Sequence, residues 1–594
     1  MKHPSRAIAS LSLAAALFLG GCGTGADEST VTAQGVTSAV TTSSVTGAVS
    51  ELTYADLGID EANLSVDLAD AVDVTLADGD SQGGSGVSVD GDTVTITTAG
   101  TYHVSGTLTS GSLVVDAPDG VVDLVLDGVD ITAANVAAIN VVEAGQVVLW
   151  LADGADNVLA DAEGAAVDET VEDAPNATVY SAADLWIAGE GELSVTAHAA
   201  DAITSKDTLV MVGGDVTVIA ADDGVRGKDH LVVTGGTLTA DVEGDALRSD
   251  NESVADEPDA AVGVIWIDGG TLDLTAGSDA LAAARQVTVR NGDLTLAAGD
   301  DGLHSDNVLR IAGGTVRITE SAEGIEGAYM YLSGGDVSVV STDDGINVAG
   351  GAEASAETAT TTTTVPDAGT AGGGPAGGPP MGDPSAGGQT GGDTSPDNAA
   401  GTTDAVEDLA SLTVSAMDGN GFGGPAEADN GTRFLEFSGG TYVLDTNSDG
   451  VDVNGAMTMT GGTLVVSGTE DARNGALDVD DAFTISGGTL AANGTARMAV
   501  APGEGSTQAT LALTFGGTVP AGTLITIIDD GGTQIASFTT PKASESFIYS
   551  TDALEAGADY TISVGGEVAG TSIGWLVLDG TASDGDTIGT VKAV

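Results

Sequence analysis

Hydrophobic and polar residues alternate along most of this chain in short runs that end at glycine-containing turns. Clear examples are TVTITTAG from Thr93, SLVVDA from Ser112, VDLVLDG from Val122 and VVLWLADG from Val147. Strict alternation over four to eight residues is typical of a β-strand with one buried face. The pattern therefore predicts an all-β protein, and no helical periodicity competes with it.

The runs recur with a fixed period. A turn glycine, the second of a Gly-Gly pair except at Asn291-Gly292, returns, usually after 22 residues, at Gly214, Gly236, Gly270, Gly292, Gly314, Gly335, Gly440, Gly462 and Gly488. A short repeat of this kind cannot bury its own apolar face, so neighbouring repeats stack and share one interior. We therefore expect a parallel β-helix with about 22 residues per coil. Its inward side chains would be Leu231, Val233, Ile265, Ile267, Val287, Val289, Leu309 and Ile311.

Composition divides the chain into regions. The β-helix is expected over residues 59–504, interrupted by a Gly/Pro/Thr-rich, low-complexity insertion at about 352–405. Residues 23–58 are rich in Ser, Thr and Gly and are predicted to form a flexible tether. Beyond about residue 505 the repeat stops, and residues 505–594 are expected to form a small antiparallel β region that could cap the helix.

The N-terminal segment predicts where the protein is located. Lys2 and Arg6 precede an apolar run that leads to Leu19-Gly20-Gly21-Cys22, and this segment resembles a bacterial lipobox. We expect residues 1–22 to be a signal peptide, Cys22 to be lipidated, and the protein to be an exported lipoprotein on the cell surface. An ordinary secretion signal is the alternative.

With 89 acidic and 15 basic residues, the net charge of −74 argues against nucleic acid and anionic membranes as partners.

The stretches VTITTAGTYHVSGTL, VDLVLDGVDIT and DDGVRGKDHLVVTGGTLTA, in this order, resemble a bacterial family described as carbohydrate-binding domain-containing proteins. The resemblance covers roughly residues 60–565. It implies a right-handed parallel β-helix, similar in shape to pectate lyases, that binds calcium and polysaccharides such as cellulose or pectin. It does not imply lytic activity.

Acidic-Gly turns such as Asp223-Gly224 begin each repeat. If coils stack about 4.8 Å apart, these acidic residues form a column whose mutual repulsion favours bound cations. Calcium suits such a column because it accepts six to eight oxygen ligands in flexible geometry. The alternative is that each Asp simply starts a solvated turn. The candidate calcium ligands are Asp201, Asp222, Asp223, Asp245, Asp279, Asp300, Asp301, Glu323, Asp343 and Asp344.

Two further sets of residues are candidates for carbohydrate binding. Basic residues gather in three consecutive repeats, where they could hold a uronate carboxylate or merely neutralise neighbouring Asp. An outward-facing position four residues before the turn glycine carries aromatic or basic side chains in several repeats, and these could stack on sugar rings. The candidates are Lys206, Arg226, Lys228, Arg248, Trp266, Arg310, Tyr329 and Tyr331. Packing of a loop over the aromatic residues is the alternative.

The preferred hypothesis is a surface-anchored, calcium-stabilised β-helix, expected to be a monomer, that binds an extracellular polysaccharide. A calcium-dependent polysaccharide lyase acting on uronates is the enzymatic alternative, with Arg226 or Lys228 removing the proton beside the carboxylate. A structural or adhesive stalk is the third possibility. A Ser/His/Asp hydrolase is disfavoured, because the chain has five His and no nucleophile motif.

Overall fold

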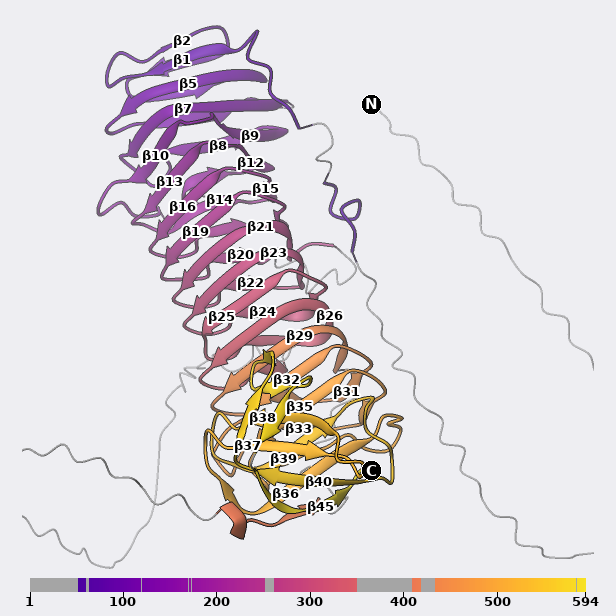
Figure 1. Cartoon of the computed structure of the whole chain (residues 1–594). Helices are drawn as coiled ribbons and strands as arrows, with labels where there is room; N and C mark the ends of the chain where they lie inside the picture. Colours follow the sequence, from indigo (N-terminus) through magenta and orange to yellow (C-terminus); the bar gives the residue numbers. More distant parts are fainter. Residues whose placement is uncertain are drawn as a thin grey trace, which may run out of the picture. The chain divides into compact units, whose positions relative to one another are not determined.

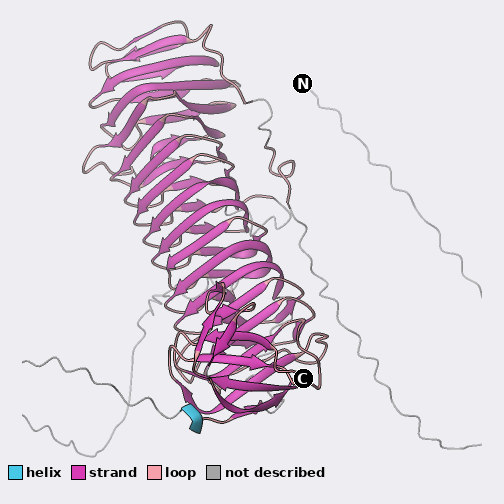
Figure 2. Ribbon diagram, viewed as in Figure 1, coloured by secondary structure: helices cyan, strands magenta, loops and turns pink. Residues whose placement is uncertain are grey.

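The computed structural model describes residues 52–59, 64–118, 120–168, 170–171, 174–251, 261–349, 409–417, 433–583 and 585–594. The signal peptide with Cys22 and the insertion at 352–405 lie outside the described residues. Within the described ranges, strands dominate and the helical content is a three-residue 3-10 helix, η4 (Leu409–Ser411) (Figure 2). No helix in this part of the chain is both long and apolar enough to span a membrane.

The repeats form a parallel, solenoid-like stack of coils, each carrying strands on up to three faces (Figure 1). Face 1 contains β4 (Thr93–Ile96), β6 (Ser112–Asp116), β8 (Ile139–Glu143), β11 (Ala177–Ser181), β14 (Asp201–Ser205), β17 (Val225–Gly227), β20 (Leu247–Ser249), β22 (Leu281–Ala283), the starts of β24 (Leu303–Ile311) and β26 (Ile325–Ser341), β27 (Ile346–Val348), β30 (Val451–Val453) and β33 (Leu477–Val479).

Face 2 contains β1 (Val72–Leu76), β5 (Gly100–Leu108), β7 (Val121–Ala133), β9 (Gln146–Leu151), β12 (Leu185–Gly189), β15 (Thr208–Met211), β18 (His230–Val233), β21 (Val264–Ala276), β23 (Gln286–Ala298), parts of β24 and β26, β29 (Phe434–Thr446), β31 (Ala456–Met459) and β34 (Phe483–Ile485). Two short strands, β2 (Gln82–Gly83) and β3 (Val87–Asp90), pair antiparallel with β1 and β4 at the first coils.

Face 3 is built where several long strands turn the corner from face 2. It contains the later parts of β5, β7, β21, β23, β26 and β29, together with β10 (Asp156–Asp161), β13 (Glu192–Ala197), β16 (Asp215–Ala220), β19 (Thr237–Val242), β25 (Thr315–Glu320), β32 (Thr463–Ser467) and β35 (Thr489–Gly494).

The register confirms that equivalent residues of successive repeats are neighbours. On face 1, Arg226 pairs with Arg248, and on face 2, Leu231 pairs with Ile265 and Ile265 with Val287. All eight side chains predicted to point inward are at most 1% exposed and belong to one continuous core. Burial of each such aliphatic side chain contributes roughly 1.5–3 kcal/mol, so the stacked interior is the main stabilising element.

The Gly-Gly turn has a steric cause. Gly236 has a φ of +86°, and a Cβ atom there would lie 2.8 Å from the backbone carbonyl carbon of Gly213 in the preceding coil. A positive φ is costly for residues with a Cβ. The turn therefore needs glycine both for its backbone conformation and for the close approach of the next coil.

The C-terminal strands are antiparallel and pack against the last coils. β36 (Thr510–Val519) and β39 (Ser544–Ser550) pair with each other, β39 also pairs with β35, and β28 (Val414–Ala416) pairs with β36. The edge of β35 is thus covered. A second sheet has the order β42 (Ser572–Ile573), β43 (Leu576–Val577), β38 (Gln534–Thr539), β37 (Leu524–Ile528), β40 (Asp559–Val564) and β45 (Asp586–Lys592), and β41 (Glu567–Ala569) pairs with β44 (Thr581–Ser583).

Candidate functional site

Acidic side chains occupy equivalent positions in successive coils, at the turns that lead into face 1. We call this set the carboxylate file. Each member lies two residues before a strand or at its start, so the parallel register of face 1 superposes them from coil to coil. The file consists of Asp201, Asp223, Asp245, Asp279, Asp301, Glu323, Asp344 and Asp449.

The Asp side chains of the file form a hydrogen-bonded ladder rather than a solvated edge. The backbone N–H of Asp245 donates to Oδ1 of Asp223 (3.0 Å), and that of Asp279 donates to Oδ1 of Asp245 (3.1 Å). The N–H of Asp301 likewise donates to Oδ1 of Asp279 (2.9 Å). Asp223 is 3% exposed, so the alternative of freely solvated turn residues is wrong for these positions.

Burial raises the pKa of most carboxyl groups in the file, because a low-dielectric surrounding disfavours the charged form. Burial raises the pKa of Asp201 to about 6 and that of Asp223 to about 7. The pKa of Asp301 rises to about 8, again mainly through burial. The pKa of Asp449, at the far end of the file, rises to about 7 for the same reason. These carboxylates need a nearby positive charge in order to ionise fully at neutral pH.

A second line of side chains runs beside the carboxylate file on the outer surface of face 1, and we call it the partner file. Each member lies three residues after a position of the carboxylate file or its equivalent, and the members pair in register between strands. They are Thr204, Arg226, Arg248, Ala282, His304, Glu326, Asn347, Asp452 and Asp478.

The two arginines of the partner file neutralise carboxylates. Arg226 bonds Asp250 through Nε (2.9 Å) and NH2 (2.7 Å), and its NH1 lies 3.7 Å from Asp201. Arg248 lies 3.4 Å from Asp223, 3.1 Å from Asp245 and 3.2 Å from Asp250. The sequence did not identify Asp250 as the carboxylate that joins the two guanidinium groups.

His304 acts as a third built-in cation. Its Nδ1 lies 2.8 Å from Asp301 and 2.9 Å from Glu326, and its Nε2 lies 3.3 Å from Asp306. Although burial disfavours its charge, the hydrogen bonds with these carboxylates raise the pKa of His304 far above its usual range. His304 is therefore an imidazolium at neutral pH.

Within the described ranges, three groups of side chains bring candidate metal-ligand atoms within 4.8 Å of one another. They are Asp201–Asp222–Asp223, Asp279–Asp301–His304 and Asp301–Glu323–Glu326. The predicted ligands Asp222, Asp300 and Asp343 are exposed beside the file. Oxygen-rich groups of this kind fit calcium in their donor type, but an imidazolium nitrogen cannot serve as a ligand while it is protonated.

The basic candidates Lys206 and Lys228 lie in adjacent coils at the turn between faces 1 and 2. Their neighbours Ser205 and Gly227, and Thr208 and His230, pair in register. Together with Arg226 and Arg248 they make up the predicted cationic patch. Both arginines donate to Asp250, which supports charge compensation as at least part of their role.

The aromatic prediction needs one correction. Trp266 points outward from face 2 but is 0% exposed, because residues 52–59 pack over it. The Tyr54 ring lies 5.6 Å from the Trp266 ring, and the Tyr54 hydroxyl donates to Oδ2 of Asp268 (2.7 Å). Trp266 is therefore not accessible to a sugar ring, and the covering segment belongs to the region predicted to be a tether.

The remaining aromatic candidates cluster further along face 2. The guanidinium carbon of Arg310 lies 3.8 Å from the centroid of the Tyr331 ring, and Phe434 contacts both Tyr331 (5.2 Å) and Tyr329 (5.5 Å). All three candidate side chains are half-buried. Arg310 thus covers one face of Tyr331, and the structure joins these residues into one packed group rather than an open row.

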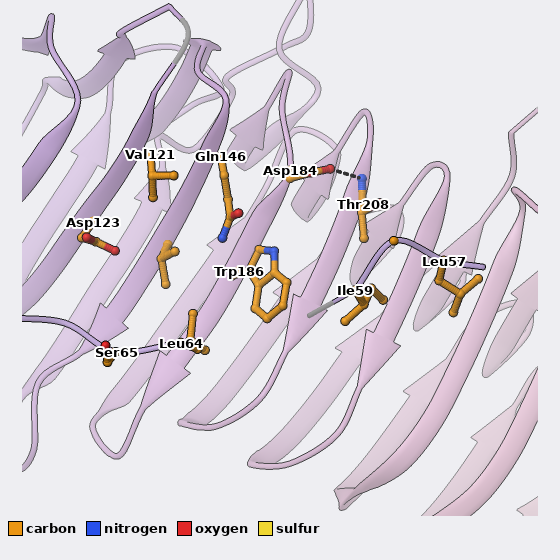
Figure 3. A pocket seen from close by; sticks show the side chains of 12 residues that line it. Leu57, Ile59, Leu64, Ser65, Val121, Asp123, Gln146, Asp184, Trp186 and Thr208 are labelled. Carbon is orange, nitrogen blue, oxygen red and sulfur yellow. Dashed lines mark hydrogen bonds between the residues drawn. The ribbon is translucent and has the colours of Figure 1, made fainter. Parts of the chain in front are cut away.

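A cavity of about 450 Å³ lies on face 2 beside residues 57–59 and 64–65 (Figure 3). Trp186, which is 7% exposed and belongs to the same apolar cluster as Trp266, lies in the middle of the side chains in Figure 3, with Asp123, Gln146, Asp184 and Thr208 around it. The N–H of Thr208 donates to Oδ1 of Asp184 (3.2 Å). Trp186 holds the same register position as Trp266, with Val210 and Val232 between them. The sequence did not identify the polar residues of the cavity, whose common signal is their outward place on neighbouring face 2 strands or the turns before them.

Comparison with known proteins gives a family match over part of the repeat region. The family model described as "Carbohydrate-binding domain-containing protein" matches residues 90–368. A protein of that description from Acetivibrio thermocellus is 46% identical over 205 residues, which cover 34% of this chain and 70% of the relative. A solved structure titled as a polysaccharide lyase-like protein from C. thermocellum, a gadolinium derivative, shares 30% identity with a TM-score of 0.38, covering 46% of this chain and 100% of that one. The chain belongs to the carbohydrate-binding domain-containing protein family.

Proposed function

We propose that this protein is a surface-anchored, calcium-stabilised, right-handed parallel β-helix that binds an extracellular polysaccharide of the cellulose or pectin type. Its family and its stacked parallel coils support the carbohydrate-binding part of the proposal. A regular parallel face offers a repeating surface, which suits a polymer with repeating units.

The observation that carries the proposal is the cavity at Trp186. An aromatic ring can pack against the apolar face of a sugar, while nearby carboxylate, amide and hydroxyl groups hydrogen-bond its hydroxyls. Trp186 is 7% exposed and packs in one cluster with Leu57, Ile59 and Leu64, so in this proposal its ring meets a sugar when these side chains move aside. Asp123, Gln146 and Asp184 line the same cavity and supply the polar contacts. In this proposal the sugar binds at this cavity and not at Trp266, which the sequence analysis had named as a residue that could stack on a sugar ring.

Calcium would act at the carboxylate file. Its carboxyl groups are buried and carry raised pKa values, so a bound cation would stabilise their ionised form. The group Asp201–Asp222–Asp223 offers oxygen atoms from two adjacent coils. The ion would thereby hold neighbouring coils together, which is a structural role.

The contacts of Arg226 weigh against the lyase alternative. A catalytic base must be able to give up its proton. Burial alone would lower the pKa of Arg226, but its hydrogen bonds and ion pair with Asp250 and the nearby charge of Asp201 outweigh burial. The net effect is a raised pKa, so Arg226 holds its proton. Binding without elimination is therefore the better-supported function. Incubation with polygalacturonate and calcium, followed by assay for unsaturated product, would detect lytic activity if this reasoning is wrong.

The binding proposal is tested by co-sedimentation with insoluble cellulose and with pectin, with and without chelator. Truncation of a central aromatic residue commonly costs about 2 kcal/mol, so Trp186→Ala should weaken binding roughly 30-fold. Asp123→Asn, which keeps an acceptor for the Trp150 indole N–H, is a milder second variant. Val340→Ala, at an exposed position on face 3, is the control. Equal binding by all variants would place the polysaccharide elsewhere.

The lipid anchor is tested separately. Cys22→Ser should abolish incorporation of labelled palmitate and release the protein from the membrane fraction, because lipidation needs the thiol. Membrane retention of the unlabelled variant would contradict the predicted anchor.

A further inference from the structure

The outer surface of face 2 carries a line of apolar side chains, which we call the outer apolar file. Its members occupy equivalent positions in successive coils and are at most 7% exposed. They are Val148, Trp186, Val210, Val232 and Trp266, each paired in register with the next. After Trp266 the same position carries the polar residues Thr288 and Arg310. Apolar side chains in such a line on an outer sheet face need a cover in water.

The N-terminal segment supplies this cover. Leu57 is 4% exposed and belongs to the same apolar cluster as Trp186 and Trp266. Ile59 and Leu64 also pack against this cluster and lie on either side of Trp186 in Figure 3. We call residues 52–59 and 64–65 the cover segment.

The cover segment is attached to face 2 by side chains and not by sheet pairing. Residues 52–59 and 64–65 contain no strand. The backbone N–H groups of Asp56, Leu57 and Ile59 donate to carbonyl oxygens of Thr53 and Tyr54, within the segment itself. Since these bonds do not involve the coils, the segment can lift from face 2 without breaking the parallel ladder beneath it.

The contact between the cover segment and face 2 is incompletely packed. A cavity of about 450 Å³ remains between Leu57, Ile59 and Leu64 on one side and the face 2 residues around Trp186 on the other. Protein interiors seldom contain voids larger than a water molecule. In addition, the buried Nε1 of Trp266 has no hydrogen-bond partner among the residues that the structure describes. A buried donor without an acceptor costs free energy, so both features weaken the closed arrangement.

A polar contact holds the cover segment at a distance from the cavity. The Tyr54 hydroxyl donates to Oδ2 of Asp268 (2.7 Å), and the Tyr54 ring lies 5.6 Å from the Trp266 ring. We call the Tyr54–Asp268 hydrogen bond the latch. Trp266 lies three coils beyond Trp186, which is about 14 Å at about 4.8 Å per coil. Loss of the latch therefore leaves the lining of the cavity unchanged.

We propose that the cover segment is a displaceable lid over the cavity at Trp186, and that the Tyr54–Asp268 latch sets how often this lid opens. The inference rests on the proposed function for the sugar site itself and adds the control of access to it. A polysaccharide binds only the open chain, so its apparent dissociation constant is the intrinsic constant divided by the open fraction. Loosening the latch increases the open fraction and tightens binding, whereas loss of an ordinary structural contact does not.

The tryptophans of the chain report lid opening without any ligand. Three of the four, Trp150, Trp186 and Trp266, belong to or pack against the covered apolar cluster, and Trp575 lies in the C-terminal region. Opening of the lid exposes these three indole rings to water. Acrylamide quenching of tryptophan fluorescence in the whole exported chain therefore measures the opening separately from polysaccharide binding.

Substitutions at the latch test the inference. Tyr54→Phe removes the donor and Asp268→Ala removes the acceptor. Each should increase acrylamide quenching and tighten co-sedimentation with insoluble cellulose and with pectin about fivefold, a typical effect of one hydrogen bond. Asp268→Asn keeps an oxygen acceptor and should stay within about twofold of the parent chain. The matched control Tyr442→Phe loses an interior bond to the carbonyl oxygen of Gly334 (3.0 Å) and should change neither measurement. Far-ultraviolet circular dichroism shows that each variant is folded.

Two results would overturn the inference. Unchanged quenching in both Tyr54→Phe and Asp268→Ala would mean that the latch does not control opening. Increased quenching with unchanged or weaker polysaccharide binding would mean that the segment is a fixed wall or a part of the binding surface. Failure of the proposed function is seen separately through Trp186→Ala. If that variant binds both polysaccharides as the parent chain does, the sugar lies elsewhere, and the inference falls with the proposed site even where quenching rises.

Discussion

Removal of one buried carboxyl group should stabilise the protein at high pH. Asp223 is 3% exposed and burial raises its pKa from 3.8 to about 7. Well below pH 3.8 the group is protonated in both the folded and the unfolded chain, so it costs nothing there, and at pH 4 its cost is still below about 1 kcal/mol. As the pH rises, the unfolded chain releases the proton first, and the folded state loses stability until the pH passes about 7.

The size of this effect follows from the pKa difference. The difference between the pKa of 3.8 in the unfolded chain and about 7 in the folded chain corresponds to roughly 4 kcal/mol at most, because a tenfold change in an equilibrium constant is about 1.4 kcal/mol. Asp223→Asn keeps an Oδ1 acceptor for the N–H of Asp245 (3.0 Å) and removes the charge. It also removes the 3.4 Å contact with Arg248, which retains Asp245 and Asp250. We therefore expect a net stabilisation of about 1–3 kcal/mol at pH 8.

Urea unfolding in chelator at pH 4 and pH 8 measures this difference. The variant should match the parent protein at pH 4 and exceed it at pH 8. The control Asp215→Asn, at an exposed position on face 3, should change little at either pH. A variant that is less stable than the parent at pH 8 would refute the reasoning, because the ion pair with Arg248 would then outweigh the burial of the charge.

Two other substitutions test the packing that positions the site. Tyr54→Phe removes the 2.7 Å hydrogen bond to Asp268 and should lower the free energy of unfolding by about 1 kcal/mol in urea titrations; an unchanged value would mean that residues 52–59 are not held by it. Gly236→Ala should cost about 3 kcal/mol, because both φ and the approach of Gly213 oppose a Cβ. Gly522→Ala, with a φ of +78° but nothing within 4 Å, should cost only about 1 kcal/mol, and equal losses would contradict the steric argument.

The repeat carried enough information to predict the stacking. A 22-residue period repeats the same turn and the same inward positions, so Ile265 and Val287 had to become neighbours if the chain coiled at all. The acidic residues of the turns follow the same rule. The succession of Asp223 and Asp245 in the carboxylate file was therefore predictable from sequence spacing alone.

Only the tertiary structure decided what surrounds these positions. Trp266 has an outward place in the repeat, but Tyr54, more than two hundred residues earlier, covers it. Asp250, in a segment outside the period, joins Arg226 to Arg248. Periodicity specifies backbone pairing because each coil repeats the local geometry of the last, whereas contacts from non-repeating segments depend on where the folded chain brings them.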